Sequence, residues 1–296
     1  MRRWMIPLVG LLPLSAQAGY PDDVSLTQLA TYDGSEVTDT AITGEAYETV
    51  VAQLAAGIAN QPLLPAYTLG VSGFDISLNN RLTFLRADSD TGEDPTGWER
   101  MHADGSPARA LWVPTLGVRK GLPFSLEVGG NLGYIAFSRQ TAFGAYGRWG
   151  LLEGYRSMAP DLTLQVGYTG YVGNDELELG VTDMSVTIGY TWAFGQLADV
   201  HHGTFSPFLS FGLLAIRAEP RLSDADQTAL GVHALPCYDT TDATTGNTTE
   251  TCVDGLKPLE LALGMQVQSN DAYARLGTAW SPVGLPTISF TMGLEY

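Results

Sequence analysis

The stretch TISFTMGLEY, residues 287–296, alternates strictly between apolar residues and small or polar ones. Successive side chains of a β-strand point to opposite faces, so this period of two predicts a strand with one apolar and one polar face. The residues that would share the apolar face are Ile288, Phe290, Met292, Leu294 and Tyr296.

The same period of two recurs from about residue 66 to the end of the sequence. Five stretches follow it closely and four more roughly, which together with the last stretch predicts about ten strands. Twelve strands are the alternative, if Leu78–Asn80 is a turn. Short turns alternate with long segments at 87–108 and 218–256, which is typical of an up-and-down antiparallel barrel in a membrane. The regular stretches are 74–84, 124–134, 162–168, 184–194 and 259–267, and the rougher ones are 109–119, 145–156, 205–217 and 272–280.

A soluble β-sandwich would also alternate, but its outward face would carry many charges. Here the polar face is mostly Gly, Ser, Thr, Asn and Gln, and aromatic residues gather at strand ends, as at Trp112, Trp192 and Trp280. Twenty of the 32 acidic residues lie in the segments 19–60, 87–108 and 218–256. The strands are left nearly neutral, as a lipid-facing wall requires, so we predict an all-β transmembrane barrel over residues 66–296.

The first 18 residues have the three-part pattern of a secretory signal peptide. Arg2 and Arg3 precede a short apolar run, and small residues at 16–18 predict cleavage after Ala18. The formal net charge of −17 becomes more negative when the two arginines are removed. A nucleic-acid partner would need a basic surface, so this charge excludes that class.

Residues 19–65 form an expected periplasmic segment with one helix at about 43–59. Tyr47, Val50, Leu54 and Ile58 recur at three- and four-residue steps, which predicts a helix with one apolar stripe. Thr43 is the expected N-cap. We expect the stripe to be buried at or inside the periplasmic opening of the barrel.

The signal peptide, the alternating strands and the final FTMGLEY resemble the outer-membrane β-barrel proteins of Gram-negative bacteria. The resemblance implies a place in the bacterial outer membrane, contact with its lipid, and an assembly signal at Phe290, Leu294 and Tyr296 that the barrel-assembly machinery reads. The stretch QPLLPAYTLGVSGFDI, residues 61–76, also resembles the start of uncharacterised proteobacterial barrel proteins.

The polar faces of the strands carry a few charges that should point into the lumen. They could form ion pairs that fill a narrow interior, or line a path for ions or small solutes. The candidates are Asp75, Arg81, Glu127, Arg148, Asp183, Glu260, Arg275 and Glu295.

Cys237 and Cys252 are the only cysteines, and in an exported protein they predict one local disulfide. A zinc site would need more histidines nearby. Asp88, Asp90, Glu93 and Asp94 could hold a divalent cation, although they lack the pattern of an EF-hand loop and are expected to be solvated. We expect no cofactor.

The four histidines are His102, His201, His202 and His233, and the sequence places no serine or acidic partner beside them at a known catalytic spacing. We therefore expect a non-enzymatic surface or structural barrel with acidic outer loops. A narrow channel gated by the N-terminal helix and an outer-membrane hydrolase are the alternatives.

Overall fold

A computed structural model describes residues 23–30, 40–87, 95–101, 107–153, 159–197, 200–241, 248–253, 256–282 and 286–296. The expected signal peptide, His102 and the four acidic residues of 88–94 lie outside these ranges. The elements in chain order are η1 (Thr27–Ala30), α1 (Thr40–Ile58), β1 (Phe74–Phe84), α2 (Gly97–Arg100), β2 (Ala110–Leu122), β3 (Leu126–Tyr134), β4 (Thr141–Leu152), β5 (Asp161–Val172), β6 (Leu177–Gly189), β7 (Trp192–Leu197), β8 (Val200–Pro220), α3 (Asp224–Leu230), β9 (Cys237–Thr241), β10 (Thr248–Cys252), β11 (Leu259–Ser269), β12 (Ala272–Trp280) and β13 (Thr287–Glu295).

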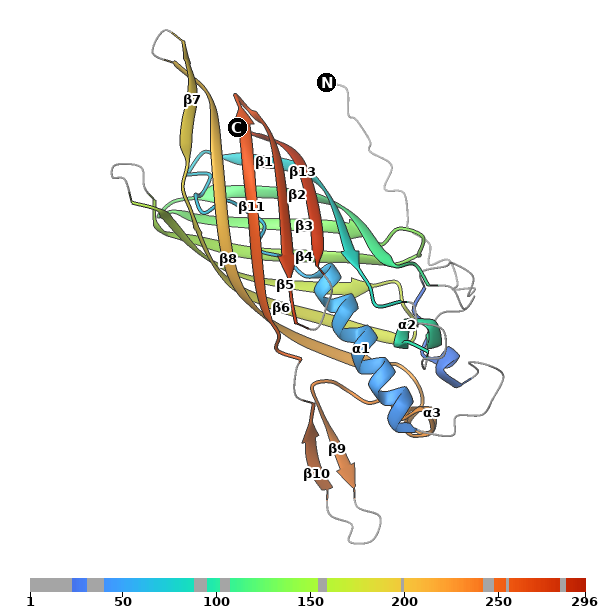
Figure 1. The fold of residues 1–296 in the computed structure, drawn as a ribbon. Helices are drawn as coiled ribbons and strands as arrows, with labels where there is room; N and C mark the ends of the chain where they lie inside the picture. The colour runs from blue at the N-terminus through green and yellow to red at the C-terminus, as the bar shows by residue number, and fades with distance from the viewer. Residues whose placement is uncertain are drawn as a thin grey trace, which may run out of the picture.

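Ten of these strands close into an antiparallel barrel, which confirms the predicted architecture (Figure 1). The order runs β1 to β6, then β8, β11, β12 and β13, and β13 pairs with β1. At this seam the backbone N–H groups of Phe74 and Tyr296 each donate to the other residue's carbonyl oxygen, at 2.9 and 2.8 Å. Leu78–Asn80 lies within β1 and is not a turn, so ten strands is correct and twelve is wrong.

Two further pairs of strands extend the barrel at its opposite ends. At the short-turn end, where residues 123–125 and 270–271 connect strands, β7 pairs with the first residues of β8. At the long-loop end, where the connections after β1 and β8 lie, β9 and β10 form a separate hairpin. Figure 1 shows β7 and the C-terminus at one end, and α3 with the β9–β10 hairpin at the other.

The outer face of the wall is an apolar belt, and one strand shows where the belt ends. In β6, Met184, Val186 and Ile188 point outward and are 54%, 39% and 40% exposed. Nearer the long loops the pattern reverses, because Leu177, Leu179 and Val181 are buried inside while Glu178 and Thr182 face outward. β8 does the same, with Leu214 and Ile216 inside and Arg217 and Glu219 outside. This part of the wall therefore has an apolar interior and a water-compatible exterior.

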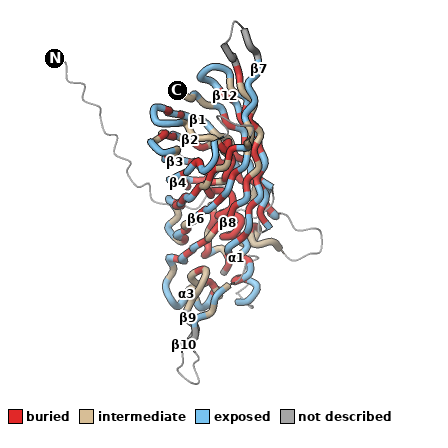
Figure 2. The backbone as a smooth tube through the Cα atoms, turned by 90° about the vertical axis from the view of Figure 1, so that its left-hand side faces the viewer, coloured by how far each residue is buried: buried red, intermediate tan, exposed pale blue. Residues whose placement is uncertain are grey.

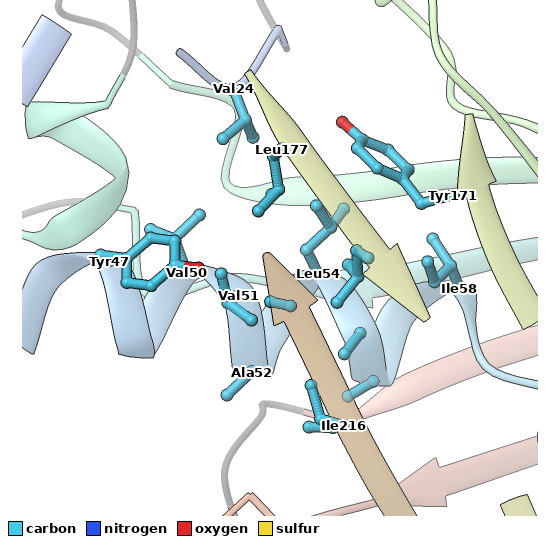
Figure 3. Close-up of a cluster of buried hydrophobic side chains, with 14 of the residues drawn as sticks. Val24, Tyr47, Val50, Val51, Ala52, Leu54, Ile58, Tyr171, Leu177 and Ile216 are labelled. Carbon is cyan, nitrogen blue, oxygen red and sulfur yellow. The ribbon is translucent and has the colours of Figure 1, made fainter. Parts of the chain in front are cut away.

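Helix α1 fills that apolar interior. It packs against α2, α3, β1, β2, β6 and β8, and Figure 3 shows Tyr47, Val50, Leu54 and Ile58 among side chains of β5, β6 and β8. From Val50 to Ile58 every residue of the helix is buried, so this half is enclosed on all sides (Figure 2). None of the described helices is long and apolar enough to cross a membrane.

Two details predicted for this helix are wrong. It lies at the long-loop end, although the expected place was the opposite opening, because the wall residues able to bury an apolar stripe are at the long-loop end. It also begins at Thr40, so Thr43 is inside the first turn and does not cap it; the Thr43 hydroxyl donates to the carbonyl oxygens of Thr40 and Leu230.

Candidate functional site

The lumen between α1 and β1 is occupied by the chain itself. We call residues 59–70 the plug segment: they run from the C-terminal end of α1 toward the short-turn end, before β1 begins at Phe74. Three arginines of the wall donate to backbone carbonyl oxygens of this segment. Arg81 binds Ala59 at 2.5 Å, Arg275 binds Leu63 at 3.3 Å, and Arg148 binds Tyr67 at 3.4 Å and also Pro65.

Neutral side chains complete this recognition of the backbone. Gln165 donates to the carbonyl oxygen of Asn60 at 3.2 Å, Ser210 donates to that of Pro62 at 2.9 Å, and Thr163 donates to that of Ala66. Unpaired backbone carbonyls are costly when buried, and here the wall supplies their donors. The wall therefore binds the backbone of the plug segment, and it also binds polar side chains of the segment, since Asn131 donates to Asn60 and Gln266 donates to the Tyr67 hydroxyl at 2.6 Å.

Glycines in the wall make room for the plug segment. A Cβ atom on Gly144 would lie 2.5 Å from the side-chain oxygen of Asn60, and one on Gly277 would lie 2.7 Å from Leu63 Cδ2. A Cβ atom on Gly189 would lie 3.2 Å from the Cβ atom of Ala66. These distances are shorter than ordinary van der Waals contact, so side chains at these three positions would press against the plug segment.

Little space is left beside the plug segment. A cavity of about 60 Å³ lies between Asn60, Leu63 and wall residues that include Arg81 and Tyr146. A volume of this size holds a few water molecules and is far smaller than an open pore. The plug segment therefore leaves little free volume in the part of the lumen next to Asn60 and Leu63.

The charges near the short-turn end form a buried network. Arg119 lies 3.1 Å from Asp75, 3.4 Å from Glu127 and 3.9 Å from Glu295, and Arg148 lies 3.1 Å from Glu127. Arg119 was not among the predicted lumen charges; it is the last residue of the stretch 109–119, which follows the alternation only roughly. Its position in phase with Leu111, Val113 and Thr115 of the same strand could have identified it.

The remaining lumen charges lie deeper along the barrel. Arg275 donates to Gln266 at 2.9 and 2.8 Å and lies 4.9 Å from the ring centre of Tyr273. Asp183 accepts from Gln165 at 3.2 Å. Glu260 is 4% exposed and shares its row of the sheet with Gly212. The structure thus places the eight sequence-predicted charges inside the barrel, and Glu295 at its rim is the most exposed of them.

The chain before α1 covers the long-loop end. The carboxylate of Glu176, in the β5–β6 turn, accepts from the backbone N–H groups of Leu26 at 2.5 Å and Thr27 at 3.1 Å. The backbone N–H of Ser25 donates to Met101 after α2 at 3.1 Å, and Asn174 donates to the carbonyl oxygen of Val24 at 2.8 Å. Residues 23–29 therefore fasten two outer connections to each other.

An acidic groove of about 1170 Å³ opens between α1, α3 and the β9–β10 hairpin. Glu45, Glu48, Asp224 and Glu250 line it, with His233. The His233 Nε2 atom lies 3.5 Å from a carboxylate oxygen of Glu48, and burial lowers the pKa of His233 below its usual 6.5. Burial, and then the neighbouring Glu45 charge, raise the pKa of Glu48. Both shifts favour neutral side chains at this contact.

Aromatic rings enclose His233. Its ring centre lies 3.6 Å from that of Tyr238 and 6.5 Å from that of Tyr47. Burial raises the pKa of Tyr47 further above its usual value. The neighbours Glu48, Tyr47 and Tyr238 do not form a nucleophile–base pair with His233. His201 and His202 belong to β8 by their backbone, and their side chains are outside what the structure describes.

The predicted disulfide joins Cys237 to Cys252 at the base of the β9–β10 hairpin. Glu250 lies close to both sulfur atoms, but sulfurs bonded to each other are not available as thiolate ligands for a metal. At the other end, the expected assembly-signal residues Phe290, Leu294 and Tyr296 point outward and are 39%, 44% and 64% exposed.

No protein-family model and no curated protein matches the chain. Solved structures of outer-membrane barrels do match it. Ail of Yersinia pestis is 10% identical over 76% of this chain and 99% of its own, with a TM-score of 0.25. The transport unit of the autotransporter AIDA-I from Escherichia coli is 9% identical over 86% and 97%, with a TM-score of 0.35. Omp33 of Acinetobacter baumannii is 7% identical over 76% and 98%, with a TM-score of 0.29. The sheet of the present chain is closed and has an apolar outer belt, so the chain is a ten-stranded transmembrane β-barrel.

Proposed function

We propose that this chain is a closed barrel of the bacterial outer membrane that acts at the cell surface through its long-loop end and does not conduct solutes. The observation that carries the proposal is the plug segment, which three wall arginines and several neutral donors bind along its backbone. A segment held at so many points is part of the folded structure.

The long-loop end supports a role in presentation. A structured cap lies above the apolar belt at this end. It consists of α1, α3, residues 23–29 and the disulfide-linked β9–β10 hairpin. The acidic groove in this cap is a surface suited to positively charged molecules. We also propose that the acidic residues of 88–94 can bind a divalent cation. Lipid of the outer membrane and the barrel-assembly machinery are the proposed partners of the belt and the last strand.

The test is a conductance measurement on the folded full-length protein in a planar lipid bilayer. Folding is confirmed beforehand by the anomalous migration of the unheated protein on a gel. We expect no stepwise current. A variant lacking residues 23–70, if its unheated migration shows a folded barrel, is expected to conduct because the backbone that fills the lumen is gone. Steady single-channel current from the intact protein would overturn the proposal and favour a channel.

A hydrolase is the weaker candidate. His233 is the one histidine whose described side chain lies in a groove, and it contacts a carboxylate and two tyrosines. Lipid or peptide hydrolysis by the purified protein that is lost in His233→Ala would favour this alternative.

A further inference from the structure

The chain before the plug segment and the chain after it lie at opposite ends of the apolar belt. Residues 23–29 and α1 are at the long-loop end, where they contact Glu176, α2 and α3. β1 begins at the short-turn end, where Lys120 donates to the carbonyl oxygens of Ser72 and Gly73 at 3.0 and 3.2 Å. The chain that precedes β1 has therefore crossed the membrane once before the barrel's own strands begin.

Two routes exist for that crossing, and the lipid route is expensive. The segment carries Asp23, Glu45 and Glu48, and each charge would have to enter the hydrocarbon. The lumen offers donors instead, because Arg81, Arg148 and Arg275 bind carbonyl oxygens that every residue has. Donors of this kind can accept successive residues of a passing chain, and in the final structure the wall also binds the side chains of Asn60 and Tyr67.

The width of the lumen sets the form in which the chain passes. Beside the plug segment a cavity of about 60 Å³ is left, and Gly144 and Gly277 approach the segment closely. An α-helix with its side chains is roughly 10–12 Å across, which is wider than a chain without helical structure. α1 lies in the portion nearer the long loops, lined by residues such as Leu179, Val181 and Leu214.

We propose that the barrel delivers its own N-terminal segment to the outer face, an inference that rests on the outward orientation in the proposed function. Residues 23–58 pass through the forming lumen as an extended chain. α1 then folds in the apolar outer portion, where Tyr47, Val50 and Leu54 are fully buried and prevent return. The plug segment is the part of the chain that remains in the channel it used.

The test uses three insertions between Tyr20 and Pro21 of the full chain. The first is a flexible epitope. The second is a small domain that its own disulfides lock into a folded form before the barrel assembles. The third is that domain with its cysteines replaced by serine, so that it stays unfolded. Two readouts are made on each: antibody access on intact cells, and the unheated gel migration of the barrel.

We expect the epitope to be reached from outside and the barrel to fold. The locked domain should reduce the amount of folded barrel at least about tenfold, because it cannot pass the lumen, and the cysteine-free domain should restore it. If the locked domain appears outside on a folded barrel as efficiently as the unlocked one, passage through the lumen is wrong. If the epitope is reached only after the outer membrane is permeabilised, delivery itself is wrong.

Orientation is measured separately so that the two proposals fail independently. Ala225→Cys on α3 marks the long-loop end and Phe124→Cys, which replaces a residue 87% exposed in the β2–β3 turn, marks the short-turn end. A membrane-impermeant thiol reagent on intact cells should label the first and not the second. That result together with an inaccessible epitope would overturn the delivery and leave the surface orientation standing, whereas the reverse labelling would overturn both.

Discussion

The carboxylate of Glu127 accepts a hydrogen bond from the backbone N–H of Leu69 at 3.2 Å, so the barrel wall binds the plug segment through an ionised side chain. The same carboxylate lies 3.4 Å from Arg119 and 3.1 Å from Arg148. Arg148 in turn binds the carbonyl oxygens of Pro65 and Tyr67. Glu127 therefore couples the ion pairs of the wall to the position of the plug segment.

Glu127→Gln should destabilise the barrel by roughly 3–5 kcal/mol, because removal of one partner leaves buried charges without compensation. The measurement is the urea dependence of unheated gel migration in detergent. The matched control is Glu178→Gln, which breaks an ion pair with Arg221 at 2.7 Å whose side chains are 59% and 54% exposed. That change should cost less than about 1 kcal/mol. Equal effects of the two substitutions would contradict the buried network.

Gly277→Ala should displace the plug segment. The added Cβ atom would lie 2.7 Å from Leu63 Cδ2, and overpacking of this kind costs about 1–3 kcal/mol. Limited proteolysis within residues 59–70 of the folded protein should become faster. Gly147→Ala is the control for replacing a strand glycine, since a Cβ there meets no atom within 4 Å. Unchanged proteolysis in Gly277→Ala would contradict the displacement of the plug segment.

Acid should loosen the contact between the loop at His233 and helix α1. The folded-state pKa of His233 is below the usual 6.5, so its contribution to stability is complete above about pH 6.5 and is lost as pH falls through the lowered value. Glu48 acts in the opposite sense, because its raised pKa makes the folded state lose stability as pH rises above about 4.5. The protection factors of residues 224–238, which are hydrogen-exchange rates corrected for the pH dependence of intrinsic exchange, measure the balance at pH 7.5 and 5.5.

Two variants separate these contributions. His233→Gln should abolish the loss of protection at pH 5.5, because glutamine does not titrate. Glu48→Gln should keep it and make it larger, because relief from protonating Glu48 is gone. If the protection factors of the unmodified protein are the same at both pH values, and those of Glu48→Gln are as well, protonation of His233 does not weaken the contact.

The sequence predicted the strands well because alternation records which side faces lipid. In β6 the alternation also changes phase near Asp183, where the apolar positions move from outside to inside, and that change marks where the belt ends. The apolar stripe on α1 indicates a helix face that must be buried. Its period does not indicate at which end of the barrel the helix lies. The phase change in β6 and β8 was the available signal for the long-loop end.

The plug segment could not have been predicted from its side chains. QPLLPAY has no helical or strand period, and several of its contacts use carbonyl oxygens, which every residue carries. The wall arginines that bind the plug segment have the same sequence pattern as arginines that only form ion pairs. Only the arrangement in space shows that Arg148 binds a backbone oxygen and a carboxylate at once.

A cross-link between the plug segment and the wall tests whether residues 59–70 fill the lumen. Ala66 and Gly189 are suited to it, because a Cβ atom on Gly189 would lie 3.2 Å from that of Ala66, near the roughly 3.5–4.5 Å that disulfides need. Ala66→Cys is combined with Gly189→Cys, with Cys237 and Cys252 replaced by serine. In the folded barrel we predict a disulfide, seen as the loss of two hydrogens in the intact mass and no thiol labelling. Two free, labelled thiols in the folded barrel would contradict a lumen filled by this segment.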